Sequence, residues 1–179
     1  MLKHRPIWRG FVLFLIALAS IALDRYTKYL VRTYLPLRQS WNPIPWLNPI
    51  FTFTHIRNTG AAFGLFSNMS VVFIFIALAV IVAIVIYYRQ IATASWVLQV
   101  ALGLQLGGAV GNMIDRILYG YVTDFIDFRV WPVFNVADAS IVVGTILLAY
   151  YALFMERPKG GDEALPERPE ADAHEAGDS

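Results

Sequence analysis

Hydrophobic residues fall into four long runs separated by more polar segments. The runs cover 8–23 (continuing more weakly towards 35), 71–88, 91–114 and 133–154. A helix needs ~20 mostly apolar residues to cross the hydrocarbon core of a bilayer. We therefore predict an α-helical integral membrane protein with four transmembrane helices. Their expected spans are approximately 9–34, 70–89, 92–114 and 133–154 within a single membrane domain at 1–155.

The segment 35–69, between the first two runs, predicts local structure of a different kind. It carries Trp41 and Trp46 among prolines, which is typical of an interfacial, turn-rich stretch. Residues 50–57 then alternate in polarity with β-favouring side chains, and 121–128 form a second extended stretch after a glycine. We expect the two stretches to form a small extracytoplasmic β platform beside the spans.

The third run contains small residues at helical spacing. Gly103, Gly107 and Gly111 recur every four residues, so they lie on one helix face. Small residues at this spacing allow two membrane helices to approach closely. The stripe therefore predicts tight helix packing.

Charge is distributed unevenly along the chain. Residues 1–155 hold 11 Lys or Arg and 5 Asp, whereas residues 156–179 hold 3 Lys or Arg and 8 Asp or Glu. The acidic, proline-containing segment 156–179 predicts a disordered tail. Four spans put both termini on one face of the membrane, and put 35–69 and 115–132 together on the other. Lys and Arg are balanced between the two faces, so they do not decide which is cytoplasmic.

Several kinds of catalytic site are excluded by composition and motifs. The chain has no cysteine, and its three histidines are His4, His55 and His174. It lacks the H-E-x-x-H zinc motif, the G-x-S-x-G nucleophile elbow and the phosphate-binding G-x-x-x-x-G-K-S/T loop. The remaining candidates for chemistry are aspartate, asparagine and arginine side chains.

These polar residues gather near the ends of the third and fourth runs. Asn112 shares a helix face with Asp115, three residues on, and with Arg116, four residues on. Asn135 and Asp138 are also three apart, and Asp124 lies between the two runs. One reading is that the aspartates serve as helix caps and ion-pair partners. Asp115 would then pair with Arg116 or Arg129. Asp138 fits this reading less well, because it lies inside an apolar run without a basic neighbour.

The other reading is chemical. Two carboxylates held together at low dielectric share a proton, and such a pair can deprotonate water and protonate a leaving amine. Buried aspartates also serve proton-coupled transporters. Clusters of aspartate also bind Mg²⁺, as in a lipid-phosphate enzyme. The residue types alone leave these three alternatives open.

Five short blocks occur in a fixed order along the chain. They are DRYTK at 24–28, NTGAAFG at 58–64, GNMIDR at 111–116, VTDFID at 122–127 and FNVAD at 134–138. Together, over residues 10–155, they resemble the bacterial lipoprotein signal peptidase (signal peptidase II) family. The resemblance implies an intramembrane aspartyl endopeptidase. Such an enzyme removes signal peptides from prolipoproteins by cutting on the amino side of a diacylglyceryl-modified cysteine.

The resemblance also implies roles for individual residues. Asp124 and Asp138 would be the catalytic pair. Asn112, Arg116 and Asn135 would surround the pair and hold the substrate backbone. Asn58 and Asp24 would support the site or the fold. Arg25 departs from the pattern, because the family usually has glutamine after the first aspartate.

Further expectations follow from the same resemblance. No metal or other cofactor is expected. The partners would be a lipid-modified prolipoprotein and membrane lipid, without nucleic acid, and the protein would act as a monomer inhibited by globomycin-type cyclic peptides. It would lie in the bacterial cytoplasmic (inner) membrane with both termini cytoplasmic and its active site near the outer leaflet.

Overall fold

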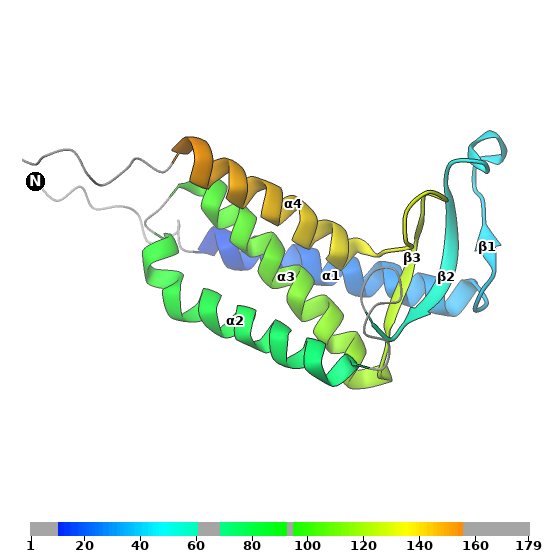
Figure 1. Ribbon diagram of the computed structural model, residues 1–179, viewed down its shortest axis with the longest axis horizontal. Helices are drawn as coiled ribbons and strands as arrows, with labels where there is room; N and C mark the ends of the chain where they lie inside the picture. The colour runs from blue at the N-terminus through cyan, green and yellow to red at the C-terminus, as the bar shows by residue number, and fades with distance from the viewer. Residues whose placement is uncertain (1–10, 61–68, 93–94, 156–179) are drawn as a thin grey trace, which may run out of the picture.

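Four helices run side by side, and a small sheet lies at one end of the bundle (Figure 1). The computed structural model describes residues 11–60, 69–92 and 95–155. The elements in chain order are α1 (Phe11–Tyr34), β1 (Ser40–Trp41), a 3-10 turn (Pro45–Leu47), β2 (Thr52–Asn58), α2 (Ser70–Ala92), α3 (Trp96–Tyr119), β3 (Val122–Asp127), α4 (Val136–Tyr150) and a π-helical turn (Tyr151–Met155). The tail expected at 156–179 lies outside the described residues.

Among the described residues, three helices are long and apolar enough to cross a membrane. These helical stretches are Ser70–Tyr88, Trp96–Tyr119 and Val136–Met155. The remaining predicted span, at 9–34, corresponds to α1, which has 24 residues but carries Asp24, Arg25 and Lys28. The structure therefore supports a helical membrane protein with three candidate spans. That α1 crosses the membrane as a fourth span stays a prediction.

Two helices have boundaries that differ from the edges of the apolar runs. The span expected at 92–114 is α3, which begins at Trp96 because the Ser95 hydroxyl caps its first turn by accepting from the Val97 N–H at 3.2 Å. It continues to Tyr119 and ends where Gly120 adopts a left-handed conformation at φ +76°. The span expected from 133 is α4, which begins only at Val136. Apolar runs therefore locate these helices but not their first and last turns.

The predicted β platform is a three-stranded antiparallel sheet in the order β1-β2-β3. Strand β2 overlaps the stretch expected at 50–57 and continues to Asn58, and β3 lies within the stretch expected at 121–128. Thr52 pairs with Asp127 and Ile56 with Asp124, and the register shifts between Phe53 and Ile56. A bulge of this kind bends a strand and changes which way its side chains point. The sheet thereby fixes Asp124 opposite the carboxyl-terminal half of β2.

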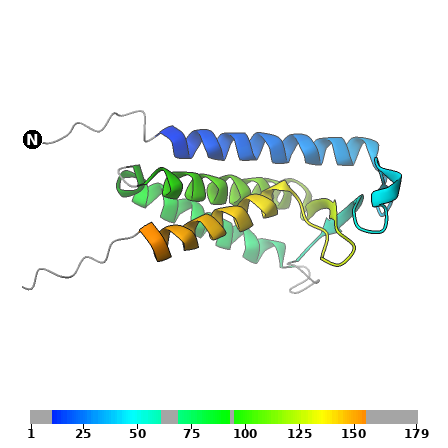
Figure 2. The ribbon, with the colours of Figure 1, turned by 90° about the horizontal axis from the view of Figure 1, so that it is seen from above.

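The central helix is α3, which contacts the other three helices. In the second view α1 runs along one side of the bundle (Figure 2). The glycine stripe faces α1, as predicted: a Cβ at Gly103 would lie 2.7 Å from the Leu13 carbonyl oxygen, and one at Gly111 would lie 2.7 Å from Asp24 Oδ2. This close approach brings polar residues of α1 against the end of α3 nearest the sheet.

Candidate active site

Asp138 is positioned by the cap of α4. Asn135 is the N-cap residue, and its Oδ1 accepts from the Asp138 N–H at 2.9 Å. The Asn135 N–H donates in return to Asp138 Oδ2 at 3.2 Å. This reciprocal capping box satisfies two backbone donors of the first helical turn. It also holds the carboxylate of Asp138 at the amino-terminal end of the helix.

Asp124 reaches the same place from β3. Its side chain is 1% exposed, and both of its oxygens accept amide donors. Asn135 Nδ2 donates to Oδ1 at 2.7 Å, and Asn58 Nδ2 donates to Oδ2 at 2.9 Å. Asn58 is itself held in its turn, because its Oδ1 accepts from the Gly60 N–H at 2.9 Å. A single residue, Asn135, is therefore hydrogen-bonded to both aspartates.

Asn112 connects the pair to α3. Its Nδ2 donates to Asp138 Oδ1 at 2.7 Å, while its Oδ1 accepts from Asn135 Nδ2 at 3.2 Å. The side chains of Asn112 and Asn135 are buried, with 6% and 0% exposure. The two asparagines thus form a continuous hydrogen-bonded frame around the carboxylates of Asp124 and Asp138.

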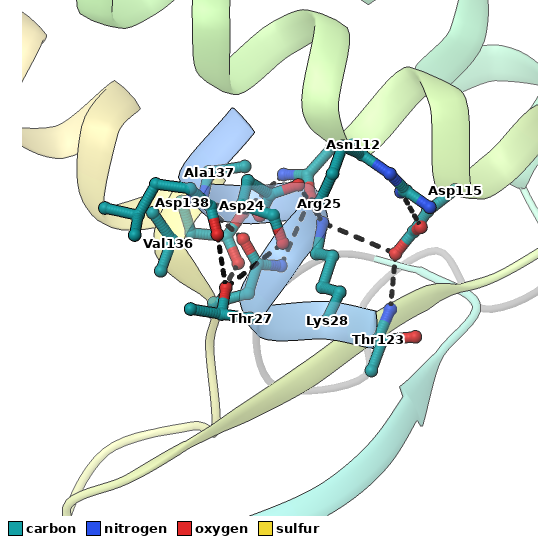
Figure 3. Close-up of polar contacts among 12 residues, drawn as sticks. Asp24, Arg25, Thr27, Lys28, Asn112, Asp115, Thr123, Val136, Ala137 and Asp138 are labelled. Carbon is teal, nitrogen blue, oxygen red and sulfur yellow. Dashed lines mark hydrogen bonds and ion pairs between the residues drawn. The ribbon is translucent and has the colours of Figure 1, made fainter. Parts of the chain in front are cut away.

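Asp24 supports this frame from α1. Its Oδ1 accepts from the Ala137 N–H at 3.0 Å, and Lys28 Nζ lies 2.9 Å from its Oδ2 (Figure 3). Both charged side chains are fully buried. A carboxylate at the amino terminus of a helix is favoured by the helix dipole and by the unpaired N–H groups there. Asp24 therefore fixes the first turn of α4 against α1.

Asp115 is the centre of a second polar cluster, formed with basic residues of α1 and with β3. Its Oδ1 contacts Arg25 and, at 3.1 Å, Arg32, whereas its Oδ2 lies 3.4 Å from Lys28 Nζ and accepts from the Thr123 N–H at 3.0 Å. Asp115 is fully buried, and breaking a buried ion pair by removing one partner is strongly destabilising. The bond to Thr123 attaches β3 to α3 one residue before Asp124.

The ion-pair role weighed for Asp115 is correct, but the partners expected for it are wrong. Its partners come from α1, not from Arg116 or Arg129. Arg129 lies instead 3.8 Å from Asp127, which also accepts from Thr54 Oγ1 at 2.7 Å. Asp127 thus serves as an ion-pair and hydrogen-bond partner, which agrees with the reading of the aspartates as caps and ion-pair partners.

Arg116 lies on α3, one helical turn beyond Asn112. Its Nη2 donates to the Gly60 carbonyl oxygen at 3.3 Å, and its guanidinium carbon lies 4.8 Å from the centre of the Phe73 ring. Its Nε is buried and has no hydrogen-bond partner among the described residues. The side chain therefore keeps an unused donor in an enclosed position.

The electrostatics of the pair suit proton transfer. Burial, reinforced by the neighbouring Asp138 carboxylate, raises the pKa of Asp124 to about 7. Two interacting carboxylates titrate as a unit, so such a pair can share one proton. One group can then act as a general base while the other acts as a general acid.

A family model described as signal peptidase (SPase) II matches residues 16–154. The chain belongs to the signal peptidase II family. The lipoprotein signal peptidase of Moorella thermoacetica is 41% identical over 146 residues, which cover 82% of this chain and 95% of that protein. The lipoprotein signal peptidase of Caldanaerobacter subterraneus subsp. tengcongensis is 46% identical over 143 residues, covering 79% and 92%.

Solved structures support the same assignment. A bacterial membrane enzyme determined by the in meso method at 2.3 Å resolution aligns with a TM-score of 0.71 and 33% identity, covering 83% of this chain and 94% of that one. Membership of the signal peptidase II family makes this chain a peptidase, and its apolar helices make it a membrane enzyme. The resemblance inferred from the five sequence blocks is confirmed.

The structure brings together most of the residues singled out from the sequence of this peptidase. Asn58, Asn112, Asp124, Asn135 and Asp138 form one hydrogen-bonded group. Asp24 and Arg116 lie at its edge, while residues 61–64 of the second block lie outside the described residues. Sequence reasoning missed the fully buried lysine of α1. Its spacing of four residues from Asp24 was the available signal, since such a pair shares a helix face.

Proposed function

We propose that this peptidase removes signal peptides from diacylglyceryl-modified prolipoproteins, using Asp124 and Asp138 as an aspartyl dyad. The observation that carries the proposal is Asn135, which is hydrogen-bonded to both carboxylates. Burial favours the neutral form of both carboxylates. We assign the proton of the pair to Asp124 and the negative charge to Asp138, because Asp138 lies in the first turn of α4, where the helix dipole favours a carboxylate.

Hydrolysis then proceeds without a covalent intermediate. The Asp138 carboxylate takes a proton from a water whose oxygen attacks the scissile carbonyl carbon, and Asp124 gives its proton to the carbonyl oxygen. In the breakdown of the tetrahedral species, the C–N bond breaks as Asp138 gives its proton to the leaving amine. Asp124 takes a proton from a hydroxyl of the same species, which forms the carboxylic acid product and restores the single proton of the dyad. General acid–base catalysis of this type contributes typically 10²- to 10⁴-fold. The amine released belongs to the lipidated cysteine.

Arg116 supplies a donor for the substrate backbone in this proposal. A guanidinium remains charged at any relevant pH and offers several donors in one plane. The buried Nε supports this role, because it has no hydrogen-bond partner within residues 11–60, 69–92 and 95–155 and could donate to a peptide carbonyl oxygen. Asn112, Asn135 and Asn58 hold the carboxylates, and Asp24 holds the helix on which Asp138 lies.

The same proposal includes the membrane arrangement. We place α1 as a fourth span beside the three apolar helices, with both termini cytoplasmic and the dyad near the outer leaflet of the bacterial inner membrane. The pairing of Asp24 with Lys28 supports insertion, because charges inside a membrane protein are tolerated when they are paired and face the bundle interior. We also propose that the protein acts as a monomer in contact with membrane lipid and is inhibited by globomycin-type cyclic peptides.

The test is cleavage of a defined substrate by the purified full-length protein. A diacylglyceryl-modified prolipoprotein should be shortened on a gel, and mass spectrometry should find the lipidated cysteine at the new amino terminus. Globomycin should block the reaction, and EDTA should not. Asp124→Asn and Asp138→Asn should each abolish cleavage while the variants still purify and melt like the parent. Full activity in either variant would remove the dyad, and loss of activity with EDTA would favour a metal-dependent enzyme.

A further inference from the structure

Lys28 is a fully buried cation that contacts an asparagine in addition to two carboxylates. Its Nζ lies 2.9 Å from Asp24 Oδ2 and 3.4 Å from Asp115 Oδ2, and it donates to Asn112 Oδ1 at 2.9 Å. Asp115 already has Arg25 and Arg32 as partners. Lys28 therefore pairs with two carboxylates and also contacts Asn112, which belongs to the frame around Asp124 and Asp138.

That contact determines which way the Asn112 amide faces. An ammonium group has three donors and no acceptor, so only the amide oxygen can face it favourably. Turning the amide over would set its NH₂ against Lys28 and against Asn135 Nδ2, which also donates to Oδ1. With the oxygen fixed towards Lys28, Nδ2 must point to Asp138, where it donates at 2.7 Å.

The consequence concerns Asp138, because Asp124 takes its two side-chain donors from Asn135 and Asn58, whereas the donor that depends on Lys28 is the one that Asn112 places on Asp138. A donor held on a carboxylate oxygen favours the ionised form of that group. The charge of Lys28 acts on both aspartates, and it acts on Asp138 together with that of Arg116. Asp24 and Asp115 are the anions facing Lys28 itself.

We propose that Lys28 is a positioning residue that, through Asn112, keeps a donor on Asp138 and thereby favours the ionised form of that carboxylate, which serves as the general base. The inference rests on the proposed aspartyl mechanism and adds to it the residue that holds this donor in place. The polar contacts of Lys28 in the described part of the chain are with Asp24, Asn112 and Asp115, so its effect on the pair is indirect.

The test compares four variants of the purified full-length peptidase in the prolipoprotein cleavage assay, measured as kcat and KM across pH. Lys28→Met removes both the charge and the donor. Lys28→Gln matches methionine in length but retains an amide donor for Asn112. Lys28→Met alone leaves the buried Asp24 carboxylate without its cation, which could prevent folding. The double variant Lys28→Met/Asp24→Asn removes that carboxylate charge as well. Arg25→Gln is the matched control, because it removes a cation from the same cluster without contacting Asn112.

Lys28→Met should lower kcat by roughly tenfold with little change in KM, because the effect is on proton transfer and not on binding. The acidic limb of its pH profile should move to higher pH by about one unit, since loss of a nearby cation disfavours the ionised carboxylate. The double variant should show the same two changes. Lys28→Gln should show the pH shift with a smaller loss of kcat, and Arg25→Gln should resemble the parent.

Two results would overturn the inference. One is a double variant with the parent's kcat and acidic limb. The other is a Lys28→Gln variant that differs from the parent only in thermal stability. Asp124→Asn in the same assay separates this outcome from failure of the proposed function. If that variant remains active, the dyad itself is wrong. If it is inactive while the Lys28 variants keep the parent's pH profile, only the role of Lys28 is refuted.

Discussion

Replacement of Asn135 separates its structural contribution from its catalytic one. The side chain caps α4 through its contact with the Asp138 N–H at 2.9 Å, and it donates to Asp124 at 2.7 Å. Asn135→Ala removes both interactions. Asn135→Ser keeps a hydroxyl able to cap the helix but removes the amide donor, because a serine oxygen at an N-cap accepts from the helix.

The structure sets the expected magnitudes. Loss of an N-cap costs about 1 kcal/mol of stability. Because the proton is assigned to Asp124, the lost bond is one to a neutral group and costs ~0.5–1.5 kcal/mol, which corresponds to a reduction of roughly 2- to 13-fold in kcat/KM if it falls on the transition state. Asn135→Ala should therefore lose both stability and activity, whereas Asn135→Ser should keep the parent's melting temperature and lose only activity.

The pH profile gives a second, independent readout. The donor from Asn135 favours ionised Asp124, and without it the pKa of Asp124 should rise further above its value of about 7. Protonated Asp124 then persists to higher pH, so the basic limb of the profile should move upward in both variants. Thermal unfolding in detergent and cleavage of a prolipoprotein across pH would measure these effects. An Asn135→Ser variant with the parent's activity and basic limb would refute the reasoning.

Three further predictions concern other parts of the molecule. Arg116→Lys should reduce turnover efficiency by roughly 10- to 100-fold, because a lysine replaces the planar fork of donors with a point charge; near-parental rates in the cleavage assay would remove Arg116 from the site. Gly103→Ala should destabilise the protein by ~1–3 kcal/mol, since the new Cβ would lie 2.7 Å from the Leu13 carbonyl oxygen; an unchanged melting temperature would contradict this. A reporter fused after Phe154 should be cytoplasmic and one inserted at Trp41 extracytoplasmic; the opposite pattern would exclude the proposed orientation, and two reporters on the same face would exclude three spans between them.

Local patterns predicted the parts of the fold that depend on near neighbours. Apolar runs located the helices, and alternation located β2 and β3. The spacing of Asn135 and Asp138 was noticed before the structure showed a capping box, which joins residues three positions apart. The glycine stripe of α3 was also read correctly as a packing face, because its period is that of the helix itself.

Interactions between distant elements were not predictable in the same way. Asp115 pairs with Arg25 and Arg32, which lie 90 and 83 residues earlier in the chain. A sequence shows which residues share a helix face, but not which helix that face meets. Lys28 was overlooked for the same reason, since its contact with Asn112 depends on how α1 packs against α3.

The dependence of the dyad on a residue at the start of α4 has a consequence for biosynthesis. Asp124 is made before Asn135, and Asp138 follows both, so neither carboxylate has its full set of partners until the last helix has packed against α1 and α3. A ribosome-bound chain that has inserted only its earlier helices therefore lacks a complete site. Under the proposed mechanism, activity would therefore arise in the same step that completes the fold.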